Sequence, residues 1–478
     1  MKNIIRLLTL PVFLLMFAGC DKDTMEDINE YKNNPSDVPS KLLVTDIITR
    51  TAFTISGSDL AFYASVYSEY NVGIYNQMYN AEIRAGEPIS STTYNNMWGA
   101  AYENLYNLKI VMGKTSEGGA EAGNFQTLGI AQILTAYNVG MLTDLFGDVP
   151  YSEALQPGVI FQPVLDKQQD LYTEIFRLLN EGIANLGRET EYPSIGGQDL
   201  LFGGDSDMWI KFANGLKARH TALLALRNPN WQDVITFADL SFAEGENAAF
   251  EYDGAQTANP FYTFFTDRDY FGASQSLHDK LIERNDPRDE VFFMPYPGTE
   301  ELIFAPNGSP EQAQGVYGVS ALMSVTNPTY LLSYHELQFL KAEAYARLDQ
   351  VAPAQTAMEN GIRAAFVKVG LTVEDADAYI TAEVLPRFQA NALSEIMNQK
   401  YLALYEEEAV QTYNDIRRMI ALGEDFISLS NPLNAQSRFP VRYSYGADDV
   451  TTNLNVAGAY GDGSYVYNQP VWWAGGSR

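Results

Sequence analysis

Apolar residues recur every three or four positions along much of the chain, and this spacing constrains the fold more than any other feature. An α-helix turns once in about 3.6 residues, so a stripe with this period lies on one helix face and is buried against a neighbour. We therefore predict a chain built mainly of helices that each bury one side. The stripes of the first half are Trp98, Tyr102, Leu105, Leu108 and Met112; Ile130, Leu134, Tyr137, Met141 and Leu145; Leu171, Ile175, Leu178, Gly182 and Leu186; and Trp209, Phe212, Leu216 and Leu223.

The second half repeats the pattern and adds a short turn between two stripes. One stripe runs from Leu337 to Leu348, the turn Asp349-Gln350 follows, and a stripe of small residues runs from Ala354 to Ala364. Two helices joined in this way form a hairpin of the size of a tetratricopeptide unit, about 34 residues. We predict four such pairs, at intervals too irregular for a regular solenoid. They cover residues 92–144, 166–226, 333–369 and 391–422.

Two of these helices have a sequence signature for their first turn. Asp166-Lys167-Gln168-Gln169 and Ser333-Tyr334-His335-Glu336 both match a capping box. In that motif a short oxygen side chain accepts from a free amide of the first turn, and Gln or Glu reaches back. We predict helix starts at both places.

Two long segments have a different texture. Residues 228–330 and 428–478 are rich in aromatic and turn-forming residues, with some short strands expected, for example at Glu290–Met294, but no extended sheet. Segments of this length without regular structure are unusual in a compact domain and are commonly functional. We interpret them as insertions in one helical domain, residues 39–478.

The N-terminus has the pattern of a bacterial lipoprotein signal. Lys2 and Arg6 precede an apolar run too short to span a membrane, and Ala18-Gly19 then stand directly before Cys20, the only cysteine. This resembles a lipobox in which Phe17 replaces the usual Leu. We predict cleavage before Cys20 and acylation of that residue, with several acyl chains forming a lasting anchor. The alternative is ordinary secretory cleavage next to an incidental cysteine.

Residues 1–19 are thus predicted to be a signal peptide, and residues 20–38 a lipidated tether. The start of the tether, Asp21 to Asp27, is acidic. It fits a solvated linker, and it equally fits the early acidic signal that sends some lipoproteins to the outer cell face.

Composition excludes two kinds of partner and leaves one question. The 478 residues include 60 acidic and 31 basic ones, a net charge of −29. Binding nucleic acid, or adsorbing to an anionic bilayer by charge, requires an excess of Lys and Arg, so neither is expected. The open question is the role of 30 Tyr, 25 Phe and 5 Trp. Tyr in particular suits partly wet surfaces, because it has an apolar face and a polar tip.

Several stretches together resemble the SusD/RagB family of nutrient-binding outer-membrane lipoproteins, specifically its SusD-like branch. Each is weak alone, but they occur in the family's order along nearly the whole chain. One departure is Gly215, where the family more often has Ser. The matching stretches are Phe146-Gly147-Asp148-Val149-Pro150-Tyr151-Ser152-Glu153-Ala154-Leu155; Gly204-Asp205 with Trp209 to Arg219; Asn327-Pro328 with Glu336 to Ala344; Gln399-Lys400-Tyr401 with Asp415-Ile416-Arg417-Arg418; Phe439 to Tyr443; Asn453; and Val471-Trp472-Trp473.

The resemblance implies a mainly α-helical, SusD-like fold: four tetratricopeptide-like helix pairs packed against a loop-rich irregular half with short strands. It also implies a cell-surface lipoprotein of a Gram-negative outer membrane that captures an oligosaccharide. Such a protein delivers the oligosaccharide to a SusC-like TonB-dependent transporter. The RagB branch implies peptide capture as the alternative, and the resemblance does not decide between glycan and peptide.

The residues themselves support a carbohydrate site. Sugars present apolar C–H faces ringed by hydroxyls, so aromatic rings with polar side chains at their edges are suitable receptors. Two aromatic-polar clusters fit, one within residues 63–98 and one within 261–270. For any single ring, including Trp98 on its helix stripe, core packing is the competing interpretation. The predicted ligand-binding residues are Tyr75, Tyr79, Arg84, Tyr94, Asn95, Trp98, Tyr262 and Tyr270.

Other matched residues are predicted to be structural. Asp148, Trp209, Arg417 and Trp472 are expected to hold turns and helix packing.

Catalysis is the rival class. A glycoside hydrolase needs two carboxylates about 5 to 10 Å apart, and the sequence singles out no such pair. His220, His278 and His335 are isolated, with no HExxH motif, and the glycine pairs lack the Lys of a phosphate loop. We predict no enzymatic activity, no catalytic residues, no metal and no cofactor. A secreted glycoside hydrolase is the less favoured alternative.

Overall fold

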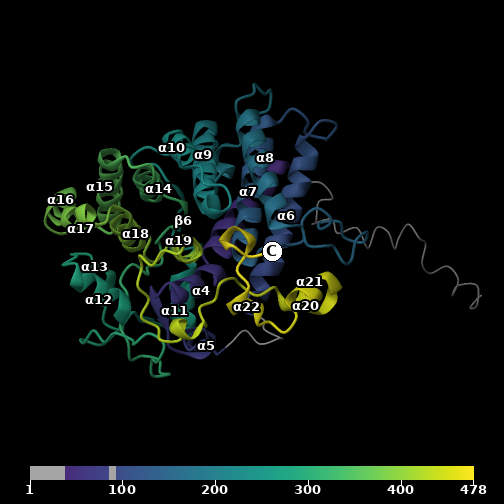
Figure 1. The fold of residues 1–478 in the computed structure, drawn as a ribbon. Helices are drawn as coiled ribbons and strands as arrows, with labels where there is room; N and C mark the ends of the chain where they lie inside the picture. Colours follow the sequence, from purple (N-terminus) through teal and green to yellow (C-terminus); the bar gives the residue numbers. More distant parts are fainter. Residues whose placement is uncertain (1–37, 86–92) are drawn as a thin grey trace, which may run out of the picture.

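The computed structural model describes residues 38–85 and 93–478, so the predicted lipidation site Cys20 lies outside the described residues. The described chain is mostly helical, as predicted, with a few very short strands (Figure 1). Two π-helical turns, Thr51–Ser56 and Ile380–Val384, and several single 3₁₀ turns connect the longer elements. The helices up to α13 are α3 (Ser40–Arg50), α4 (Asp59–Tyr67), α5 (Asn76–Glu82), α6 (Asn95–Thr115), α7 (Phe125–Phe146), α8 (Gln168–Leu186), α9 (Ser206–Leu223), α10 (Trp231–Asp239), α11 (Pro260–Arg268), α12 (Gln275–Glu283) and α13 (Asp289–Phe292).

The remaining helices begin at the third predicted pair. They are α14 (Tyr334–Arg347), α15 (Val351–Lys368), α16 (Val373–Tyr379), α17 (Leu385–Ala390), α18 (Ala392–Ala403), α19 (Ala409–Leu422), α20 (Ala447–Thr452), α21 (Leu454–Tyr460) and α22 (Tyr465–Asn468). The helices of the four predicted pairs are present, as α6 and α7, α8 and α9, α14 and α15, and α18 and α19. The first three pairs pack as predicted, whereas α18 packs mainly on α14 and α15, and α19 mainly on α4.

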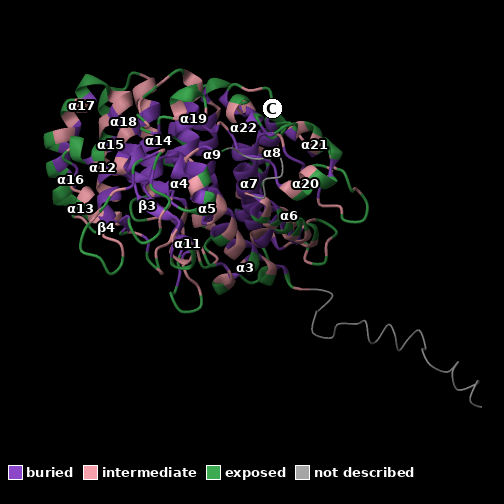
Figure 2. Cartoon of the chain, turned by 90° about the horizontal axis from the view of Figure 1, so that it is seen from below, coloured by how far each residue is buried: buried purple, intermediate pink, exposed green. Residues whose placement is uncertain are grey.

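One helix is more deeply buried than its stripe predicts. Every residue of α7 from Thr127 to Phe146 is buried, so this helix hides all its sides rather than one. Figure 2 shows the buried residues running through the centre of the molecule along α4, α7, α9 and α14. A helix that is apolar all round belongs in the core of a large domain.

Glycine lets two of these helices approach closely. A β-carbon on Gly182 of α8 would lie 2.8 Å from a side-chain carbon of Ile133 and 3.0 Å from the carbonyl oxygen of Gly129, both on α7. A methyl group would therefore force the helices apart. Gly215 on α9 makes room for a side chain from another part of the chain, because a β-carbon there would lie 2.2 Å from Leu332 Cδ2.

Both predicted helix starts are confirmed, because α8 begins at Gln168 and α14 at Tyr334, but only α14 has part of its predicted cap. Ser333 caps α14, with its side chain accepting from the amide of Glu336, while the Glu336 carboxylate binds Arg219 instead of reaching back. At α8 the carboxylate of Asp166 accepts from the amides of Tyr151 and Ser152 instead of from the helix. The carboxylate that the motif predicts as the cap of α8 therefore stabilises the turn before that helix instead.

The strands form antiparallel pairs only, in the part of the chain that is described. β1 (Asn71–Gly73) pairs with β3 (Phe271–Ala273), β2 (Ala248–Phe250) with β6 (Thr329–Leu332), and β4 (Phe293–Met294) with β5 (Val319–Ser320). The strand expected at Glu290–Met294 is mostly wrong, because residues 289–292 are helical. Only its last two residues are in a strand.

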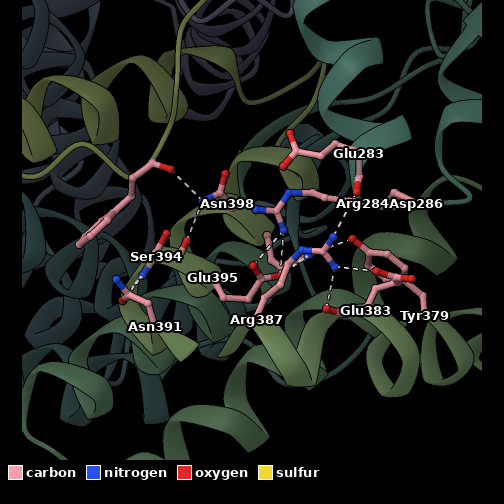
Figure 3. A network of polar contacts seen from close by, with 12 residues as sticks. Glu283, Arg284, Asp286, Tyr379, Glu383, Arg387, Asn391, Ser394, Glu395 and Asn398 are labelled. Atoms are coloured by element: carbon pink, nitrogen blue, oxygen red, sulfur yellow. Dashed lines mark hydrogen bonds and ion pairs between the residues drawn. The ribbon is translucent and has the colours of Figure 1, made fainter. Parts of the chain in front are cut away.

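The segment 228–330 is joined to the helix pairs by a polar network. Arg284, which follows α12, donates to both carboxylate oxygens of Glu395 on α18, at 3.0 and 2.9 Å. Arg387 on α17 donates to the backbone oxygen of Glu283 and to the Glu383 carboxylate. Figure 3 shows these side chains converging from α12, α17 and α18. Charge-assisted bonds of this kind fix the orientation of one element on another.

The residues predicted to be structural are confirmed in that role. Asp148 accepts from the amide of Gln168 at the start of α8, and buried Trp209 donates to Asp199 at 2.7 Å. Buried Arg417 donates to the backbone oxygen of Asp144. The Trp472 ring lies 5.0 Å from the guanidinium of Arg227.

Candidate functional site

The predicted ligand-binding residues separate into three groups in the structure. Tyr75, Tyr79, Tyr262 and Tyr270 lie around α5 and α11, Asn95 and Trp98 line a cavity at α6, and Arg84 and Tyr94 are in the interior. The two aromatic-polar clusters are partly helical: α4, α5 and the start of α6 cover part of residues 63–98, and α11 covers most of residues 261–270.

Tyr75, Phe264 and Tyr270 form what we call the aromatic surface. The rings of Tyr75 and Tyr270 are 5.6 Å apart, and Phe264 lies 5.6 Å from Tyr270. Tyr75 is 37% exposed, whereas Tyr270 is 8% exposed and supports it from behind. Tyr79 follows one helical turn after Tyr75 on α5, and Tyr262 is on α11 with Phe264.

Strand pairing brings these rings together. β1 and β3 are antiparallel, and the pairing continues as the amide of Ile74 donates to the backbone oxygen of Tyr270 at 2.9 Å. The next residue, Tyr75, therefore stands beside Tyr270, although almost two hundred residues separate them in the sequence. The side-chain amide of Asn76 also donates to the Tyr270 hydroxyl at 3.1 Å, which fixes the ring.

A buried carboxyl anchors α5 beneath this surface. Glu82 accepts from the amide of Gly308 at 2.5 Å and from the side chain of Asn431 at 3.1 Å. Burial raises the pKa of Glu82 to about 7, against the opposing effect of Arg84. One side chain thus ties α5 to two distant loops.

Arg84 and Tyr94, which are predicted to bind a ligand, are buried in the structure. Arg84 is 1% exposed and donates to the backbone oxygen of Ala81 at 2.6 Å. Tyr94 is 2% exposed and stacks on Tyr443, with ring centroids 4.3 Å apart and planes within 8°. Because other protein groups cover both side chains, neither offers a surface to a ligand in this structure.

The remaining predicted residues line a cavity of about 480 Å³, which we call the α6 pocket. One wall is a helical stripe of α6, the second is the loop after α7, and the third is the start of α20. Its lining residues are Asn95, Trp98, Gly99, Tyr102, Glu103, Tyr106, Pro150, Ala154, Leu155, Gln156, Pro157, Ile160, Pro163, Asp448 and Asp449.

Hydrogen bonds hold the walls of the α6 pocket together. Trp98 Nε1 donates to Asp449 Oδ2 at 2.7 Å, and the Asn95 amide exchanges two bonds of 2.9 Å with Asp448. The Tyr102 hydroxyl donates to the backbone oxygen of Pro150 at 2.8 Å. The walls come from three separate stretches of sequence, so local patterns did not reveal the contributions of Asp448, Asp449 and the proline-containing loop.

The histidines lie where the sequence suggests, in helices. His220 is buried in α9, where burial and the neighbouring Arg219 lower its pKa to about 3. His335 bonds Glu408 at 2.6 Å, and His278 bonds Asp289 at 2.7 Å. Across residues 38–85 and 93–478, no three His, Cys, Asp or Glu side chains are grouped as a metal site requires.

None of the helices in the described ranges has the length and apolar character needed to cross a membrane.

The model of a SusD-like family, described as starch-binding and associating with the outer membrane, matches residues 32–446. No curated protein matches the sequence.

Solved structures match over almost the whole chain. A SusD/RagB family protein from Bacteroides thetaiotaomicron is 43% identical, with a TM-score of 0.84 over 92% of this chain and 100% of the other. A chitin-binding SusD homologue from Flavobacterium johnsoniae is 18% identical, with a TM-score of 0.72 over 91% of this chain and 99% of that chain. At that identity the second match supports the fold alone.

Proposed function

The chain belongs to the SusD-like family, and from this premise we propose that it captures an oligosaccharide and delivers it to a SusC-like TonB-dependent outer-membrane transporter. The proposal includes a lipid anchor on Cys20 and a position on the outer cell face, with residues 20–38 as the tether. The observation that carries it is the family match, whose description names starch binding and the outer membrane.

The aromatic surface is the proposed place of capture. Tyr75 offers an exposed ring that packs against Tyr270, and Asn76 in turn holds the Tyr270 hydroxyl; an exposed, supported ring suits stacking on the apolar face of a sugar. Tyr79 and Tyr262, on the two helices that carry this surface, are the proposed neighbouring contacts. Asn95 and Trp98 belong to the α6 pocket, whose charge points to a different ligand.

We propose that the protein catalyses no reaction. Glu82, Asp144 and Glu406 are the carboxyls whose pKa burial raises to about 7, a value suited to a general acid. All three are buried and are held by hydrogen bonds, from Tyr172 in the case of Asp144 and from Asn71 in the case of Glu406. Their positions favour a structural role over glycoside hydrolysis.

Calorimetric titration of the full chain with a panel of neutral oligosaccharides tests capture. We expect one or more glycans to bind, and we expect Tyr75→Ala to weaken that binding at least about tenfold, the order of a lost stacking contact. Tyr106→Ala is the matched control, because Tyr106 is 38% exposed but lies in the α6 pocket.

Three results would contradict the proposal. Binding of peptides but of no glycan in the panel would favour the peptide-capturing alternative. Release of reducing sugar from a glycan would show an enzyme. Equal effects of the two tyrosine variants would remove the aromatic surface from the site.

A further inference from the structure

The α6 pocket shares no residue with the aromatic surface, and its lining has a distinct chemistry. We propose that it is a second binding site, which takes an organic cation: an ammonium group carried on a saccharide or apolar body. The shape, the charge and the aromatic wall of the pocket each support this ligand class.

The shape suits a body larger than one small ion. A volume of about 480 Å³ lies in the usual range of small-molecule sites. Pro150, Pro157, Ile160 and Pro163 form the wall opposite α6 and present mainly carbon to the cavity. The ligand therefore needs an apolar body or an apolar face.

The charge of the lining has one sign. Its charged residues are Glu103, Asp448 and Asp449, all acidic. Glu103 is already paired with Arg50 at 2.9 Å, whereas the carboxylates of the two aspartates accept from the neutral side chains of Asn95 and Trp98 on α6. These bonds use Oδ2 of each aspartate, and a carboxylate can accept more than one hydrogen bond. An ammonium group can donate a further hydrogen bond to these carboxylates, whereas their negative charge repels an anionic ligand.

The environment of Asp449 adds a second reason. Burial raises its pKa, and the adjacent Asp448 raises it further, so the two negative charges destabilise each other. A cation at this point reduces that repulsion. A pair of like charges beside a mainly apolar cavity is therefore better suited to a cationic ligand than to a neutral one.

The aromatic wall supplies the third contribution. Trp98, Tyr102 and Tyr106 follow one another at four-residue steps on α6, so their rings lie along one face of the helix. The rings of Trp98 and Tyr102 are 5.1 Å apart. Trp98 is mostly covered, and Tyr106 is the exposed ring of the three. Aromatic faces attract ammonium groups, and combinations of aromatic rings with carboxylates are typical of sites for organic cations.

Calorimetric titration of the full chain in detergent at low salt tests the proposal. The probes are tetraglucosamine, with four amines; tetra-N-acetylglucosamine, its uncharged counterpart; tetragalacturonate, an anionic sugar; and trilysine, whose amines are on a peptide. We expect the amine-bearing probes to bind at least about tenfold more tightly than the other two, with affinity falling as salt rises.

The variants assign that binding to the α6 pocket. The isosteric double change Asp448→Asn and Asp449→Asn is expected to lower affinity for tetraglucosamine at least about tenfold, with a thermal midpoint close to that of the wild type. Asp267→Asn is the matched control, an exposed aspartate on α11 that does not line the α6 pocket. Tyr106→Ala, which changes an exposed ring, provides a second test if the double variant is unstable.

The outcomes distinguish the sources of the amine. Binding of tetraglucosamine alone supports an amino sugar as the ligand, and binding of trilysine with the same sensitivity to the variants supports a peptide amine. Equal affinity for tetra-N-acetylglucosamine and tetraglucosamine would overturn the proposal. It would also be overturned by a tetraglucosamine affinity that Tyr75→Ala lowers and the aspartate variants leave unchanged.

Discussion

Tyr94 and Tyr75 come from the same tyrosine-rich stretch of sequence, yet they lie in different surroundings. Tyr94 is stacked on Tyr443 in the interior, and Tyr75 is an exposed ring at the aromatic surface. The difference arises from which distant segment covers each ring. The C-terminal segment closes over Tyr94, whereas the strand pair β1–β3 only supports Tyr75 from one side. Aromatic content alone therefore does not identify a binding site, and each ring has to be tested for its effect on stability and on binding.

The largest effect is expected in the interior. Tyr94→Ala removes a ring that packs against Tyr63, Phe146 and Tyr443, so the free energy of unfolding should fall by about 3–5 kcal/mol. Urea unfolding followed by circular dichroism measures this change. An unchanged stability with lost glycan binding would return Tyr94 to the ligand site.

The second prediction concerns Glu82 beneath the aromatic surface. Its folded pKa of about 7 is above the value of an unfolded glutamate, so it contributes stability below about pH 4.3 that is lost as the pH rises through 7. Glu82→Gln removes this titration, and the variant should lose less stability, by about 3 kcal/mol, between pH 4.5 and 8.

Unfolding free energies of both proteins at several pH values check this expectation. Glu343 serves as the contrasting control. Burial alone would raise its pKa, but the bonds from Arg418 lower it to about 2, so its contribution is lost only as the pH falls toward that value. Parallel pH profiles for wild type and Glu82→Gln would contradict the assignment.

A smaller effect is expected at Trp98, which is 3% exposed and also lines the α6 pocket. Trp98→Phe keeps a ring but removes the donor to Asp449, which should cost about 1–2 kcal/mol of stability. Thermal unfolding of this variant and of Tyr102→Phe, which loses the bond to Pro150, gives the comparison. A larger loss, near that of Tyr94→Ala, would place Trp98 wholly with the core residues.

The smallest effect on stability is expected at the aromatic surface itself. Tyr75→Ala should change the unfolding free energy by no more than about 0.5 kcal/mol, as for most exposed positions. Its thermal midpoint should therefore match that of the wild type. A marked loss of stability would show that Tyr75 is a packing residue and would remove the contrast with Tyr94.

The helix pairs could be predicted because they depend on local information. A period of about 3.6 residues and a turn such as Asp349-Gln350 are visible within forty residues of sequence. Their burial could not be predicted equally well. Nothing near α7 in the sequence indicates that neighbouring helices cover all its sides.

The candidate site was less predictable for the same reason. Arg84 meets Asn434, Tyr94 meets Tyr443, and Trp98 meets Asp449, each more than three hundred residues away. Residue type indicated which side chains could bind a sugar, but long-range contacts decide which of them are accessible. Asp166 shows the same limit at short range. Its motif predicts a helix cap, but its carboxylate accepts from the amides of the preceding turn.

Hydrogen–deuterium exchange of the full chain with and without a bound glycan tests the central claim, capture at the aromatic surface, most directly. We expect added protection in residues 74–83 and 260–273, which carry Tyr75, Tyr79, Tyr262 and Tyr270, with little change in α7. Protection confined to residues 95–106 or 150–163, with none at the aromatic surface, would contradict the account.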